Sequence, residues 1–156
     1  MILSMELSEW STDCPVAAVA SVQDGLKVIL GVGGAIELRS TVPPGRGRLL
    51  SRLRVFVGAS VRAIDVMGED SAIVIAGKQL ATVHIQGDEL RLNTLARDAG
   101  DWIWHGQATS GNRVVLLTAH NRVKVFNLAT GETERECGCE EKCILYAGII
   151  TRYKVT

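Results

Sequence analysis

The feature of this chain that most constrains its fold is a pattern of paired runs that occurs three times. Each pair has an apolar run, a short break at small or polar residues, and then an alternating run. The pairs are KVILGVGGAIEL (27–38), SAIVIAGKQLATVHI (71–85) and RVVLLTAHNRVKVFN (113–127). Apolar residues at alternate positions face one side of a β-strand, and a short break between two such runs suits a hairpin turn. The pattern therefore predicts three β-hairpins.

The spacing of these pairs indicates a repeat architecture. Their offsets are roughly 40–45 residues, and aligning the apolar positions matches Val28 with Ile73 and Val115. Further short runs, including the polar runs LRLNTL (90–95) and TEREC (133–137), bring each repeat to four strands. Four strands over this length form one blade of a β-propeller, with the most polar strand on the outside.

We therefore expect an all-β fold, a partial WD40-like β-propeller of about three blades plus the first strand of a fourth. The expected limits are an N-terminal segment at 1–14, an incomplete propeller at 15–156, blades at roughly 15–58, 59–97 and 100–138, and a fourth blade that begins at 143–150. Propellers close with about four to eight blades, so we expect a fragment with unpaired strand edges and low stability.

Charge and termini narrow the function classes. Lys and Arg number 17, Asp and Glu also number 17, so global charge favours neither a nucleic-acid binder nor a membrane-surface protein. The apolar runs are too short to span a membrane, and MILSMELSEW (1–10) lacks the basic start and long apolar run of a signal peptide. The four cysteines are then expected to be mostly thiols in a reducing compartment, which indicates a cytosolic or nuclear protein without membrane contact.

Two of the three tryptophans lie in the stretch DWIW (101–104). Trp102 and Trp104 share one face of a strand because side chains alternate, and Ile103 takes the other face. We expect both indole rings to pack against a neighbouring blade, where they bury much apolar area. The alternative is that they stack on unpaired RNA bases.

The break AHN (119–121) places His120 in a turn, where Asn121 tolerates a positive φ. The three histidines stand at no recognisable spacing from a nucleophile and a carboxylate, and the chain has no nucleophile motif. We therefore expect Asp65 and Asp101 to cap turns or bond the backbone, and we expect no catalytic residue.

Four motifs in order carry a resemblance to a known family: DWIW (101–104), GN (111–112), LLTAHNRVKVFN (116–127) and CEEKCILYAGII (139–150). They resemble the N-terminal region of the WD-repeat subunit that partners a tRNA 2′-O-ribose methyltransferase. RLRVFVGASVRAIDV (52–66) is similar to that family's first blade boundary, although the chain has no WD dipeptide. The motif positions of the blade are Asp101, Trp102, Trp104, His120 and Asn121.

The resemblance implies a cytoplasmic, non-catalytic scaffold that binds no cofactor or metal. Its partners would be tRNA and the catalytic methyltransferase subunit, which uses S-adenosylmethionine to methylate the ribose of the wobble nucleotide. Members of the family are several times longer than this chain, which again suggests a fragment.

Basic residues gather in one part of the sequence. Residues 39–62 hold six arginines and no acidic residue. Contacts with tRNA phosphates are one reading, and a solvated loop is the other. The candidate RNA-binding residues are Arg46, Arg48, Arg52 and Arg54, of which Arg52 and Arg54 alternate with Leu53 and are expected on one exposed face.

Two further motifs have competing interpretations. GVGG (31–34) is expected to be a hairpin turn, since a nucleotide-binding loop requires a following helix. Cys137, Cys139 and Cys143 form C-x-C-x3-C, which reads as thiols at a blade boundary, a metal site or a labile disulfide. Two other functions compete with the tRNA scaffold. The first is a WD-repeat adaptor that binds proteins and no RNA, and the second is an enzyme that binds S-adenosylmethionine through GVGG.

Overall fold

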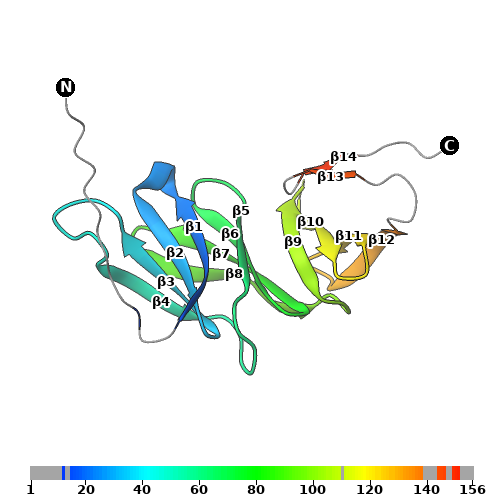
Figure 1. Cartoon of the computed structure of the whole chain (residues 1–156), viewed down its shortest axis with the longest axis horizontal. Helices are drawn as coiled ribbons and strands as arrows, with labels where there is room; N and C mark the ends of the chain where they lie inside the picture. The colour runs from blue at the N-terminus through cyan, green and yellow to red at the C-terminus, as the bar shows by residue number, and fades with distance from the viewer. Residues whose placement is uncertain (1–11, 13–14, 110, 139–143, 147–148, 152–156) are drawn as a thin grey trace.

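The chain folds into β-sheets that follow one another in chain order (Figure 1). The computed structural model describes residue 12 and residues 15–109, 111–138, 144–146 and 149–151. Within these residues the one helical element is the 3-10 turn η1 (Gln23–Gly25). Residues 1–11, 13 and 14 of the expected N-terminal segment lie outside the described residues.

Three sheets have four antiparallel strands each, and in each sheet every strand pairs with the next along the chain. The first contains β1 (Val16–Val22), β2 (Lys27–Val32), β3 (Ala35–Ser40) and β4 (Leu49–Arg54). The second contains β5 (Ala63–Val66), β6 (Ser71–Ala76), β7 (Gln79–Gln86) and β8 (Glu89–Asp98). The third contains β9 (Ile103–Ala108), β10 (Arg113–Thr118), β11 (Arg122–Asn127) and β12 (Glu132–Gly138).

Neighbouring sheets lie side by side as the blades of a propeller do. The first strands of the first two sheets, β1 and β5, contact each other, and so do their last strands, β4 and β8. The first strand of the third sheet, β9, contacts β5 and β6. The expected all-β fold, a partial β-propeller of about three blades, is confirmed.

A two-stranded sheet follows the third blade. It pairs β13 (Ile144–Tyr146) with β14 (Ile149–Thr151). The fourth blade was expected to begin at 143–150, and residues 143, 147 and 148 of that range lie outside the described residues.

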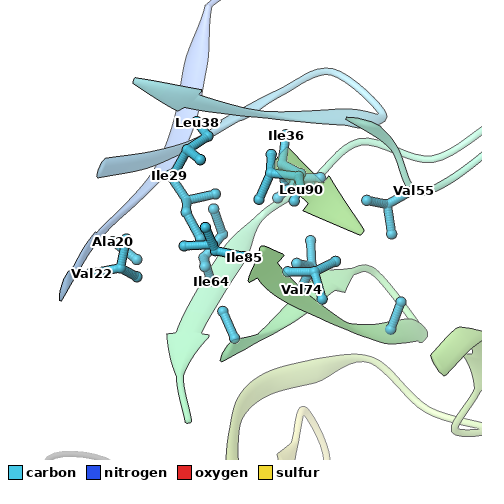
Figure 2. Packing of buried hydrophobic residues seen from close by; sticks show 14 of the residues in the cluster. Ala20, Val22, Ile29, Ile36, Leu38, Val55, Ile64, Val74, Ile85 and Leu90 are labelled. Atoms are coloured by element: carbon cyan, nitrogen blue, oxygen red, sulfur yellow. The ribbon is translucent and has the colours of Figure 1, made fainter. Parts of the chain in front are cut away.

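The second sheet is buried on both faces. Val74 belongs to a core cluster shared with the first sheet, in which Ile29 and Ile36 lie opposite the second sheet (Figure 2). Ile73 and Ile75, which point the other way, belong to a cluster shared with the third sheet. Each such side chain stabilises the fold by about 1.5–3 kcal/mol relative to exposure. The continuous apolar run of β6 is the consequence of two covered faces.

The repeat is confirmed, but its register differs by one residue from the expected alignment. The second strands begin at Lys27, Ser71 and Arg113, which are 44 and 42 residues apart. Val28 therefore corresponds to Ala72 and not to Ile73. The apolar residues of β6 are buried on both faces, so hydrophobic alternation could not fix its register.

Main-chain hydrogen bonds join each hairpin turn to the start of the next blade. The N–H of Val61 donates to the carbonyl of Gly33 at 2.7 Å. At the equivalent place in the next blade, the N–H of Ile103 donates to the carbonyl of Gly77 at 2.9 Å. Both glycines have positive φ, 59° and 64°. The repeated bond fixes where each new blade begins.

The segment after β4 passes close to Gly34. The N–H groups of Val55 and Phe56 both donate to the Gly34 carbonyl at 3.0 Å. A Cβ atom on Gly34 would lie 2.5 Å from the carbonyl oxygen of Phe56 and 2.9 Å from that of Ala59. Only glycine fits this crossing without a backbone shift.

Gly34→Ala is expected to destabilise the chain by about 1–3 kcal/mol because the added methyl group displaces packed backbone. The free energy of unfolding from urea titration measures the change. Gly68→Ala is the matched control, since nothing lies within 4 Å of a Cβ at Gly68. Equal stability of the two variants would contradict the crossing.

Candidate functional site

The paired tryptophans point to solvent. Trp102 and Trp104 are 50% and 60% exposed, while Ile103 between them is 6% exposed. That Ile103 lies on the side opposite the two tryptophans was predicted correctly, but the expectation that both indole rings bury much of their area against a neighbouring blade is wrong.

The space between the second and third sheets explains this orientation. It is filled at β9 by Ile103 and by Gly106, where even a Cβ would lie 3.2 Å from Leu116 and 3.4 Å from Ile73. An indole ring has no room there. Trp102 instead rests against Gly77, with one ring carbon 3.3 Å from the place a Cβ would take.

Asp101 and His120 form a hydrogen-bonded pair that the sequence spacing did not reveal. The His120 Nδ1 lies 2.9 Å and 2.8 Å from the two carboxylate oxygens of Asp101. The N–H of Trp102 donates to the same carboxylate at 2.8 Å. An ionised carboxylate only accepts hydrogen bonds, so Nδ1 carries the proton. The His120 side chain is 74% exposed.

The pair has an electrostatic consequence for Asp101. The hydrogen bond from His120 is the largest cause that holds the pKa of Asp101 below its ordinary value of 3.8. Partial burial opposes this effect, and the Trp102 N–H supports it. Asp101 therefore remains ionised down to low pH in the folded chain.

The expected backbone contacts of the two aspartates are confirmed. Asp101 accepts from Trp102, and Asp65 accepts from the N–H of Gly106 at 2.8 Å. Two histidines also lie near carboxylates that the sequence spacing did not indicate, because His120 pairs with Asp101 and His105 lies 3.9 Å from Asp65.

The Asp101–His120 pair ties a turn to the start of a blade. Asn121 in this turn has φ 53°, as expected. The N–H of Ala119 donates to the Trp102 carbonyl at 2.9 Å, parallel to the side-chain pair. Thr118 is fully buried and its hydroxyl interacts with Asp101, so the carboxylate stands between hydroxyl and imidazole. A catalytic triad needs the imidazole in the middle.

A hollow of about 930 Å³ opens beside this turn, here called the β10–β11 hollow. It is lined by Lys78, Gly100, Asp101, His120, Asn121, Arg122, Lys124, Glu136 and Gly138. Lys124 is only 9% exposed, and its Nζ donates to the carbonyl of Ala99 at 3.2 Å. Arg122 pairs with Glu136 at 2.6 Å.

The hydrogen bond from Arg122 holds the pKa of Glu136 below its ordinary value. Partial burial opposes this effect, and the charge of Lys124 adds to it.

Sequence reasoning missed the two lysines of this hollow. Lys124 interrupts the alternating run RVKVFN (122–127) with a charge on the side that faces the second sheet, opposite Leu116. A buried lysine at such a position was the available signal. Lys78 follows Gly77 in the β6–β7 turn, and no sequence pattern around it indicates a binding residue.

The expected RNA-binding arginines lie elsewhere, on the first sheet. Arg46 and Arg48 are exposed in the β3–β4 loop, and Arg52 and Arg54 are exposed on β4 in the expected alternation with Leu53. The structure does not bring these four residues to the β10–β11 hollow.

An acidic residue just outside the basic stretch partly neutralises it. Glu37 is 2% exposed and accepts from Nε and Nη2 of Arg39 at 3.0 Å and 2.8 Å. Its other oxygen lies 3.7 Å from Arg52. Arg39 therefore serves the fold of the first sheet.

The remaining sequence motifs have simple places. GVGG ends in the turn between β2 and β3, so no helix follows it and the hairpin expectation is confirmed. Cys137 is exposed on β12, whereas Cys139 and Cys143 lie outside the described residues.

Among the described residues, no group of three or more His, Cys, Asp or Glu side chains is arranged to hold a metal ion. The described part of the chain also contains no helix long and apolar enough to cross a membrane.

No protein-family model and no curated protein sequence matches the chain. Its fold is similar to BamB from Moraxella catarrhalis, with TM-score 0.60 and 14% identity over 83% of this chain and 38% of that one. It is also similar to the Cps50 (Swd1) β-propeller domain of Myceliophteria thermophila, with TM-score 0.63 and 11% identity over 78% of this chain and 40% of that one. The computationally designed Ika4 protein matches with TM-score 0.63 and 20% identity, over 86% and 80% of the two chains. At these identities the likeness establishes the fold alone.

Substitutions on the buried and exposed sides of β9 are expected to change the free energy of unfolding by different amounts. Ile103→Ala should cost about 2–5 kcal/mol because it empties a core position. Trp104→Ala should change stability by about 0.5 kcal/mol or less because its ring is in solvent. Urea unfolding of both variants measures this, and a larger loss for Trp104→Ala would contradict the orientation of β9.

Acid is expected to weaken the fold through Asp101. Its folded pKa is lower than its unfolded pKa, so the ionised carboxylate adds stability above pH 3.8, and this contribution is lost as pH falls through the folded pKa. Asp101→Asn should lose about 1–2 kcal/mol at neutral pH and show a flatter stability profile below pH 4 or so. Chemical unfolding at several pH values tests this, with the exposed Asp24→Asn as control. Parallel pH profiles for the parent and Asp101→Asn would refute the role of the pair.

Proposed function

We propose that this chain is part of a non-catalytic scaffold that presents tRNA to an S-adenosylmethionine-dependent methyltransferase. The reaction is 2′-O-methylation of the ribose at the anticodon wobble nucleotide, in the cytoplasm. The partner subunit supplies the chemistry, and the propeller supplies a rigid surface that fixes the target ribose beside it. The sequence resemblance of residues 100–150 to the regulatory WD-repeat subunit is the source of this proposal.

The single observation that supports RNA contact best is the exposure of both Trp102 and Trp104. Two large aromatic rings, two positions apart in sequence and each at least half exposed, are unusual on a protein surface without a partner. Single-stranded RNA stacks its unpaired bases on such rings. An anticodon loop offers bases of this kind.

The charged surface adds to this support. The side chains of Arg46, Arg48, Arg52 and Arg54 are exposed on the first sheet and its β3–β4 loop, where they give positive charge for phosphate oxygens. Phosphate contacts fix the position of RNA without reading its sequence. A scaffold that accepts several tRNAs requires contacts of this kind.

Two features that suggest an enzyme have structural roles instead. GVGG forms a turn between two strands, whereas a dinucleotide loop leads into a helix whose N-terminus binds phosphate. The Asp101–His120 pair joins a turn to a blade. Both roles agree with a scaffold.

The second candidate function is a protein-binding adaptor without RNA. It is favoured by exposed apolar side chains away from the tryptophans, namely Val19, Val57 and Leu95, which are 62%, 83% and 72% exposed. Apolar surface of this kind suits a protein partner.

Cells that lack the gene are expected to lose the 2′-O-methyl mark at the wobble ribose. The mark protects the neighbouring phosphodiester from alkaline cleavage, so the cleavage pattern of purified tRNA measures it. Re-expression of the parent gene should restore the mark, and the double variant Trp102→Ala/Trp104→Ala should restore it less. A full mark in the null cells would exclude the tRNA function and leave the adaptor.

A further inference from the structure

We propose that the β10–β11 hollow is the binding site for a single-stranded RNA segment. A backbone phosphate enters the hollow beside Lys78 and Lys124, and an adjacent base stacks on Trp102. The inference rests on the proposed function and names the site that contacts RNA.

The charges of the hollow leave two lysines with unused hydrogen-bond donors. Its lining carries three basic residues and two carboxylates. Arg122 is paired with Glu136, and the carboxylate of Asp101 accepts from His120 and Trp102. The two lysines are the basic residues outside these pairs.

The ammonium of Lys124 lies deep in the hollow. The carbonyl of Ala99 takes one of its three N–H donors at 3.2 Å, and the residue is 9% exposed. A buried ammonium is costly unless it is well paired, and Glu136 is already bonded to Arg122. Lys78 is exposed at the rim, with no side-chain hydrogen bond or ion pair to any residue that the structure describes. An anion that enters the hollow gains both donors.

Trp102 is not one of the residues that line the hollow, but it lies close to two of them. It follows Asp101 in the chain, and its ring rests on Gly77, the residue before Lys78. Half of its surface is exposed, so the contact with Gly77 holds the ring while leaving area for a base. An aromatic platform beside a basic hollow is the arrangement that binds single-stranded nucleic acid.

The ring decides between RNA and an acidic peptide. Both ligands carry negative charge, but a carboxylate side chain gains little from an indole face, whereas a base gains stacking energy there. The volume of about 930 Å³ also accommodates a group larger than a carboxylate.

Fluorescence anisotropy with a short labelled uridine oligonucleotide tests the site on the full chain. Trp102→Ala should weaken binding about tenfold, and Trp102→Phe should recover most of it, because stacking needs an aromatic face. Lys78→Ala should lower the slope of log affinity against log salt by about one. Lys124→Met, which keeps the aliphatic stem, should weaken binding as well. Circular dichroism verifies that each variant is folded.

The matched control is Arg91→Ala, which removes a positive charge that is exposed on β8 in the second sheet. It should bind close to the parent. If the parent binds RNA and the hollow variants bind equally well, this site is wrong while the proposed function stands. If the parent binds no RNA, the RNA-presenting function fails too. Binding of a glutamate-rich peptide in place of RNA, weakened by the same variants, would also overturn the site.

Discussion

The packing of the second sheet between its two neighbours is the interaction on which the rest of the structure depends. Val74 faces the first sheet, and Ile73 and Ile75 face the third, all without solvent exposure. Removal of this apolar surface from water is the main favourable term available to a chain of strands and short turns. The two cores together fix the order of the three blades and leave their turns on the surface.

Those turns then meet the start of the following blade, and functional geometry arises there. The Gly77 carbonyl accepts from Ile103, which places the flanking tryptophans at the junction of two blades. One blade further on, the Asp101–His120 pair holds the next turn against the same segment. Lys78 and Lys124 come from different blades and line one hollow because these bonds hold the junction closed. The hollow is formed by residues of the second and third blades, so its rigidity depends on the packed core between these two blades.

The sequence predicted the hairpins and the repeat because both depend on local patterns of apolar residues and turn formers. The sequence predicted that Trp102 and Trp104 lie on the side opposite Ile103, but it did not predict which side is buried. Alternation separates the two sides of a strand, and the side that is buried depends on where the neighbouring sheet lies. Gly106 was the missing information: with no side chain there, the two sheets approach too closely for an indole ring.

Contacts across turns escaped the sequence for a different reason. His120 and Asp101 are 19 residues apart and meet because β9 and β10 are paired. Glu37 lies outside the arginine-rich stretch by sequence but next to Arg39 and Arg52 through strand pairing. The number of charged residues along one stretch of sequence therefore did not predict the net charge on the surface of the folded sheet.

Photochemical crosslinking tests whether RNA binds at the junction of the second and third blades. A photoreactive single-stranded RNA is bound to the chain, irradiated and digested, and the crosslinked peptides are identified by mass spectrometry. We expect crosslinks in the peptides that contain Trp102 and Lys78. Crosslinks confined to the peptides around Arg46 and Arg54, or no crosslinks at all, would contradict this expectation.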